Sequence, residues 1–195
     1  ESSDSLLNQL QHNIVWGQKG NFVGVPTDCP QRDERLGWTG DGQVFCRTAA
    51  FNYNVATFFT RWLKDLSLEQ KKDGKVPIVI PDMLNLKDPD KALTSAGWGD
   101  AAVIIPWTLY LVYGDKGLLE NQYPGMKAWV EYIRGVAGES MIWKGGSVFG
   151  DWLFYHPLVK NHVEPDGHTE HDFIATAFYA YSASLLAETA GVLGK

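Results

Sequence analysis

The stretch of sequence that decides the fold runs from residue 41 to residue 70 and reads DGQVFCRTAAFNYNVATFFTRWLKDLSLEQ. Its apolar residues recur at intervals of three and four positions: Val44, Phe45, Phe51, Val55, Phe58, Phe59, Trp62, Leu63 and Leu66. Such spacing places side chains along one face of an α-helix. We therefore predict helix across this stretch, with a break near residues 52–54.

A first helix is predicted before this stretch. Asp4 can cap its N-terminus, and Gly17 and Gly20 are expected to end it. Its apolar positions follow the same spacing: Leu6, Leu7, Leu10, Ile14 and Val15. Residues 18–40 are rich in glycine and are expected to form a loop.

Three more helices are predicted further along the chain. Residues 100–113, 124–134 and 170–193 all carry apolar residues at helical spacing. Pro106 is expected to bend the first of these helices without abolishing it, and Gly114 is expected to end it.

Long connections separate the predicted helices, at residues 71–99 and 136–169. Connections of this length are uncommon in compact domains unless they carry function. The proline-bounded run VPIVIP at 76–81 is expected to be an extended loop segment, because no partner strands are evident. The whole pattern predicts an all-α array with its chemistry on the loops.

Composition excludes several classes of function. The 195 residues are 45% hydrophobic, enough for one domain or part of one. The net charge of -6 disfavours nucleic acid as a partner, and no run approaches the ~20 apolar residues needed to cross a membrane. Cys29 and Cys46 lack the spacing of a disulfide framework or a zinc site, so we expect both to be reduced.

The loop before the deciding stretch contains a dense group of charges, DCPQRDERLGWTGD at residues 28–41. Exposed ion pairs contribute only about 0–1 kcal/mol each, so a plain solvated surface is one explanation. A packed, functional turn is the other, because Leu36, Gly37 and Trp38 interrupt the charges. Further aromatic residues occur in loops: Trp98, Trp143, Trp152, Phe154 and Tyr155. Carboxylates beside tryptophan suit carbohydrates, since sugar C–H faces stack on indole and hydroxyls bond to Asp and Arg.

Cleavage of a glycosidic bond needs a carboxyl that donates a proton and a second carboxylate that activates water or attacks the anomeric carbon. Glu34 stands near Trp38 and is the candidate proton donor. A neighbouring apolar ring favours the protonated form of a carboxyl, whereas the adjacent Arg32 and Arg35 oppose it. Asp41 stands at the start of a predicted helix, as its N-cap or as a further polar contact.

The stretch 28–41 resembles the signature of the α-L-rhamnosidases of glycoside hydrolase family 78. The resemblance extends to SAGWGDAAVIIPWTLYLVYGD at 95–115 and FGDWL at 149–153, and covers most of residues 15–190. It implies part of an (α/α)6 barrel and hydrolysis of rhamnosides with inversion of the anomeric centre. The implied partner is a rhamnose-containing glycoside or polysaccharide, and no cofactor is implied.

The resemblance also implies roles for individual residues. Glu34 would be the general acid, Asp28 and Arg32 would hold sugar hydroxyls, Trp38 would wall the pocket and Asp41 would add a polar contact. Further pocket candidates, each equally open to a core or capping role, are Trp98, Asp100, Asp151 and Trp152.

The family's general base is a glutamate further along the chain, in a part of the barrel that these residues are not expected to reach. We therefore expect residues 1–195 to be the N-terminal portion of a catalytic domain, truncated at its C-terminus, with the rest of the parent chain as its partner. Alone, the chain is expected to have little or no hydrolase activity. It is also expected to self-associate through apolar faces that the absent helices would cover.

Two other functions stay open, an (α/α)6 glycosidase for another sugar and a non-catalytic carbohydrate-binding module. A purely structural scaffold leaves the polar loop unexplained. His168 and His171 have a spacing that suits one helical face, yet their segment equally resembles a turn before an acidic first helical turn. We therefore expect no metal site, and the sequence indicates no compartment.

Overall fold

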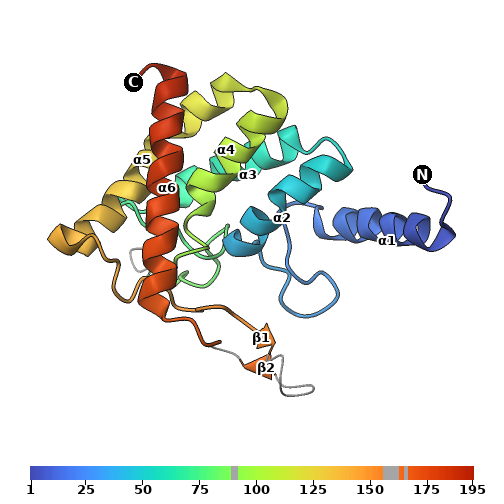
Figure 1. The fold of residues 1–195 in the computed structure, drawn as a ribbon, viewed down its shortest axis with the longest axis horizontal. Coiled ribbons are helices and arrows are strands. Elements are labelled where there is room, and N and C mark those ends of the chain that lie inside the picture. Colours follow the sequence, from blue (N-terminus) through green and yellow to red (C-terminus); the bar gives the residue numbers. More distant parts are fainter. Residues whose placement is uncertain (89–91, 156–162, 165–166) are drawn as a thin grey trace.

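The computed structural model describes residues 1–88, 92–155, 163–164 and 167–195, which are mostly helical (Figure 1). The α-helices are α1 (Ser5–Asn21), α2 (Thr39–Asn52), α3 (Ala56–Glu69), α4 (Ala101–Tyr113), α5 (Lys116–Ala137) and α6 (His171–Leu193). A 3-10 turn, η1 (Gly138–Ser140), follows α5. Two short strands, β1 (Phe154–Tyr155) and β2 (Val163–Glu164), pair antiparallel with Phe154 opposite Glu164. The expectation of an all-α array with long loops is confirmed.

The break predicted within the deciding stretch is confirmed, because α2 ends at Asn52 and α3 begins at Ala56. Helix α2 starts two residues earlier than expected, at Thr39. Asp41 therefore lies in the first helical turn, and the N-cap interpretation of Asp41 is wrong. Trp38 occupies the N-cap position and forms no side-chain capping bond.

Two predicted helix boundaries are wrong. Helix α1 continues through Gly17 and Gly20, since Gly in a helix costs about 1 kcal/mol but does not forbid it. Helix α5 begins at Lys116, well before the predicted start at Pro124. Asp115 caps it by accepting a hydrogen bond from the Leu118 amide at 2.9 Å. The buried face of α5 outweighs the hydrogen bond that Pro124 removes.

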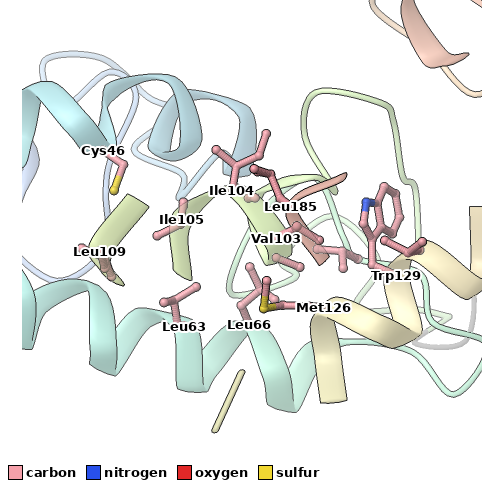
Figure 2. Packing of buried hydrophobic residues seen from close by; sticks show 14 of the residues in the cluster. Cys46, Leu63, Leu66, Val103, Ile104, Ile105, Leu109, Met126, Trp129 and Leu185 are labelled. Atoms are coloured by element: carbon pink, nitrogen blue, oxygen red, sulfur yellow. The ribbon is translucent and has the colours of Figure 1, made fainter. Parts of the chain in front are cut away.

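Helix α4 lies at the centre of the helical array and packs against α2, α3, α5 and α6 (Figure 1). Its residues 101–106 are all buried, as is Leu109, which is typical of a helix that is apolar on every side. Pro106 lies inside this helix, as predicted, and Gly114 ends it in the left-handed conformation. Figure 2 shows α4 between neighbouring core residues, among them Cys46, Leu63, Leu66, Met126, Trp129 and Leu185.

The extended segment at 76–81 is confirmed, and it lies against the chain that leads into α2. The Thr39 amide donates to the Ile78 carbonyl, and the Ile80 amide donates to the Gly37 carbonyl, both at 2.9 Å. Trp38 and Val79 form an isolated antiparallel bridge between them. Residues 76–80 are buried, so this pairing fixes the acidic loop to the core.

Helix α1 extends from one edge of the molecule, and most of it lacks a packing partner within the described residues (Figure 1). Its C-terminal half is held by Gln18, whose amide donates to the Ala49 carbonyl at 3.2 Å. Leu6, Leu7 and Leu10 are 77%, 56% and 55% exposed, so the predicted apolar stripe faces solvent. Within the described ranges, no helix combines the length and apolar character needed to cross a membrane.

The exposed stripe of α1 is expected to drive self-association of the 195-residue chain, because apolar surface of this kind is normally covered. Sedimentation velocity should show oligomers that grow with protein concentration. Replacing Leu6, Leu7 and Leu10 together by Gln should shift the chain toward monomer. The same change at three exposed leucines elsewhere, Leu68, Leu86 and Leu111, is the matched control and should have a smaller effect. A concentration-independent monomer of the unmodified chain would contradict the expectation.

The turn before α4 leaves no space for a side chain at Gly99. A Cβ atom there would lie 2.2 Å from the fully buried ring of Trp129. Gly99→Ala should therefore lower the free energy of unfolding by at least about 1–3 kcal/mol, the usual cost of overpacking. Urea unfolding followed by circular dichroism measures it. Gly20→Ala is the control, because it adds a methyl group in open space on a helix and should leave stability equal or raised.

Candidate active site

The acidic loop is closed by hydrogen bonds across its two ends. The Asp28 amide donates to the Leu36 carbonyl, and the Leu36 amide donates to Asp28 Oδ1, both at 3.2 Å. Next to this closure, a Cβ atom at Gly37 would lie 2.2 Å from the Ile80 carbonyl oxygen, so the contact requires glycine. The two ends of the loop are therefore packed, whereas the charged tip at Arg32, Asp33 and Arg35 is exposed.

Both carboxylate oxygens of Glu34 have partners within the loop. The Trp38 indole Nε1 donates to Oε1 at 2.8 Å, and Arg32 forms an ion pair with Oε2. The Glu34 side chain is 21% exposed, so solvent still reaches it. The turn thus brings together three of the predicted site residues, with the indole fixing the direction of the carboxylate.

Asp28 lies beside Glu34. One ligand atom from each of Asp28, Cys29 and Glu34 lies within 4.8 Å of the other two. Partial burial raises the pKa of Asp28, but hydrogen bonds from Cys29 and from the Leu36 amide outweigh it and hold the pKa below its usual value. Among the described residues, these three side chains are the group that could hold a metal ion. A cation already lies beside them, because Arg32 forms an ion pair with Glu34 and a hydrogen bond with Cys29.

A cavity of about 700 Å³ opens beside the loop. Its wall comes from α1, the chain before α2, α2 itself, the turn before α4, the loop before β1 and α6. The predicted site residues that line it are Asp28, Asp41, Trp98 and Trp152. Pockets for small molecules commonly have volumes of about 300–1,000 Å³, so one sugar ring fits this space.

Asp41 projects into the cavity from the first turn of α2. Desolvation by the surrounding protein raises the pKa of Asp41, and the charges of Asp28 and Glu34 raise it further. A carboxyl with a raised pKa keeps its proton to higher pH and can then donate a hydrogen bond. Asp41 is therefore a candidate for a polar contact with a ligand.

Trp98 stands on the turn before α4 with its indole against Gly40. A Cβ atom at Gly40 would lie 2.8 Å from the ring, so the helix surface is flat where the indole rests. Gln43 of α2, which the sequence did not single out, fixes this turn by donating to the Gly97 carbonyl at 2.8 Å. The Trp98 Nε1 is buried and has no hydrogen-bond partner among the described residues, which leaves a donor beside the cavity.

Phe149 is a further residue that sequence reasoning missed. Its ring contacts the rings of Trp38, Trp98 and Trp152, with centroid distances of 6.1, 4.3 and 5.7 Å. Phe149 is half-buried and lies behind the cavity wall. Phe149 is the first residue of the FGDWL stretch, which was the available signal for it. From that stretch only Asp151 and Trp152 were taken as candidates.

Asp100 does not line the cavity, and of the two roles left open for it the structure shows the core role. Its side chain is 0% exposed and accepts bonds from Trp129 Nε1 at 2.9 Å, Ser182 Oγ at 2.5 Å and the Gly97 amide at 2.8 Å. Burial raises the pKa of Asp100, and the three hydrogen bonds partly offset that rise. Asp100 therefore joins α5 and α6 to the turn that carries Trp98.

Asp151 also serves the loop and not the cavity. Its Oδ2 accepts hydrogen bonds from Thr169 Oγ1 at 3.1 Å and the His168 amide at 3.4 Å. Burial raises the pKa of Asp151, but these bonds more than offset it and lower the pKa overall. Asp151 thus ties the loop before β1 to the turn before α6 through Oδ2, and it does not line the cavity.

The two histidines and the two cysteines have separate environments. The His168 ring packs edge-on against Phe154, whereas His171 Nδ1 contacts the Ser147 carbonyl at 2.9 Å. Both cysteines are free, as predicted. Burial raises the pKa of the Cys46 thiol to about 12, which makes it an inert core residue.

Sequence comparison identifies relatives along the whole chain. The bacterial alpha-L-rhamnosidase 6 hairpin glycosidase domain matches residues 1–195. An alpha-L-rhamnosidase of Formosa agariphila is 46% identical over 194 residues, which cover 100% of this chain and 20% of that protein. One of Alteromonas sp. is 42% identical over 193 residues, 99% of this chain and 20% of that protein. The chain spans about a fifth of the length of these curated relatives.

Solved structures give the same result. A crystal structure of Streptomyces avermitilis alpha-L-rhamnosidase complexed with L-rhamnose has a TM-score of 0.85 and 43% identity, covering 100% of this chain and 17% of that one. The native Aspergillus terreus enzyme has a TM-score of 0.84 and 39% identity, covering 100% and 22%. The fold is therefore part of an (α/α)6 barrel, and the chain belongs to the bacterial α-L-rhamnosidase family of six-hairpin glycosidase domains.

Proposed function

We propose that residues 1–195 form the N-terminal portion of the catalytic domain of an α-L-rhamnosidase, which releases terminal α-L-rhamnose from glycosides with inversion. The observation that carries this proposal is a packed loop of carboxylates beside a tryptophan-lined cavity of about 700 Å³. The relatives' names and the L-rhamnose bound in one similar enzyme support the choice of sugar. The substrate is a rhamnose-containing glycoside or polysaccharide.

In this proposal, Glu34 donates the proton to the leaving oxygen. Trp38 holds the Glu34 carboxyl in its orientation through the 2.8 Å hydrogen bond to Oε1. The ion pair with Arg32 stabilises the ionised form of Glu34, so protonation of the acid removes the charge that holds the guanidinium. Arg32 therefore leaves Glu34 when the acid is protonated, and its guanidinium then binds a sugar hydroxyl beside Asp28.

The cavity wall binds the sugar ring. Trp98 and Trp152 line the cavity and offer apolar ring faces for the C–H face of the sugar, whereas Trp38 stands outside the lining and holds the acid. Asp41, with its raised pKa, provides a polar contact at the start of α2. Asp100 and Asp151 support the segments that carry the tryptophans and do not touch the substrate.

The general base comes from another part of the longer protein. Inversion requires a water between acid and base, so the two carboxyl groups stand about 6.5–9.5 Å apart. Asp28 and Glu34 have oxygens within 4.8 Å of each other, which is too close to admit that water. Asp28 is therefore a binding residue and not the base in this proposal.

Glu34→Gln in the full-length protein should lower kcat for p-nitrophenyl α-L-rhamnoside by about 10²–10⁴, because the variant has no proton to donate. Calorimetric titration with L-rhamnose should give a Kd close to that of the unmodified protein. Glu120→Gln, at an exposed position of α5, is the control and should leave both unchanged. An unmodified protein that binds rhamnose without turnover would identify a binding module, and one that prefers another glycone would identify a glycosidase for a different sugar.

The isolated 195-residue chain should show little or no turnover of the same substrate, because it lacks the general base in this proposal. The comparison is made at equal molar concentration with the full-length protein. Turnover of the isolated chain at the rate of the full-length protein would show that the base lies within these residues.

A further inference from the structure

We propose that Phe149 is the positioning residue of the sugar site, holding Trp98 and Trp152 of the cavity wall together with Trp38, which orients Glu34. This inference rests on the proposed function, since it concerns the binding of rhamnose. Phe149 touches no substrate itself, because it does not line the cavity. It acts through Trp38, Trp98 and Trp152.

The three tryptophans come from separate parts of the fold. Trp38 is the N-cap residue of α2, Trp98 lies on the turn before α4 and Trp152 lies on the loop before β1. Their shared ring partner is Phe149, which meets Trp38 and Trp152 edge-on, at interplanar angles of 79° and 73°. Trp98 lies closest, at 4.3 Å and a tilt of 42°.

Two of the three indoles have a second fixed contact, so Phe149 completes their orientation. The flat surface at Gly40 supports Trp98 from the opposite side, and Glu34 accepts the hydrogen bond from Trp38 Nε1. Trp152 is 51% exposed and is the least constrained of the three. Loss of the Phe149 ring would therefore release Trp152 first and then loosen Trp98.

The aromatic contacts determine the expected size of the effect. An aromatic pair in this geometry is worth up to about tenfold in an equilibrium constant beyond its buried area. Because the wall binds the sugar and the acid keeps its own partners, Phe149→Leu should raise KM for p-nitrophenyl α-L-rhamnoside about tenfold and change kcat less than about threefold. Phe149→Tyr keeps the ring and should restore KM to within about threefold.

Tyr132 provides the matched control. It is half-buried and its ring contacts Trp129 and Trp143, at 5.7 and 6.5 Å, away from the cavity. Tyr132→Leu in the full-length protein should reduce thermal stability without a change in KM. An equal KM for Phe149→Leu, Tyr132→Leu and the unmodified protein overturns the positioning role. No turnover and no rhamnose binding by the unmodified protein would instead overturn the proposed function.

A second measurement keeps the native packing and applies even if Phe149→Leu does not fold. 4-Fluorophenylalanine is incorporated at position 149 of the full-length protein, and its ¹⁹F NMR signal is followed during titration with L-rhamnose. The signal should shift with the same Kd that calorimetry gives, because the indoles around this ring change their environment on binding. A label at position 132 should stay unshifted. A silent label at position 149 under saturating rhamnose overturns the proposal.

Discussion

Backbone pairing between residues 37–39 and the extended segment at 76–81 is the constraint on which the site depends. The acidic loop is polar and has little apolar surface of its own, so packing alone would not hold it. Two amide–carbonyl bonds and the isolated bridge between Trp38 and Val79 fix it to a buried segment. Trp62 Nε1 of α3 donates to the Ile80 carbonyl at 3.2 Å, which holds the extended segment against α3. These contacts fix the positions of the loop's side chains relative to the core.

The same constraint determines how α2 begins. Gly37 passes within contact of the Ile80 backbone, and the chain then turns into α2 at Thr39. Thr39 is fully buried and its hydroxyl donates to the Ile78 carbonyl at 3.0 Å. The start of α2 is therefore set by contacts to a segment far along the sequence. This is why a local capping rule placed Asp41 at the N-cap and was wrong by one turn.

Sequence periodicity predicted the parts of the fold in which local pattern and packing agree. The break at 52–54, the apolar helix α4 and the last helix α6 were predicted from apolar spacing. In α6, however, Phe173 and Tyr181 of that spacing are exposed, and the buried face carries Ala175, Tyr179 and Ser182. The last turn of α1 and the first turns of α5 were not predicted. Gly17 and Pro124 are local signals, whereas the extent of a helix also depends on contacts with distant residues. One such contact is Gln18, which is bound by Asn52 at 2.7 Å.

Candidate site residues were predictable where they are neighbours in sequence. Asp28, Glu34 and Trp38 lie together because one short loop carries them all. For Asp100 a cavity contact and a core role both stayed open, because a sequence does not reveal whether a carboxylate faces solvent or other protein groups. Phe149 was not singled out, since its ring contacts join three segments that meet only in the folded chain.

The buried carboxylate of Asp100 has a consequence for how such a site can change over time. Ser182 on α6 and Trp129 on α5 both bind this carboxylate, which in turn holds the Gly97 amide beside Trp98. Ser182 is 82 positions away in the sequence and does not line the cavity. A substitution at Ser182 can therefore shift the turn that carries Trp98 while every residue that lines the cavity stays unaltered.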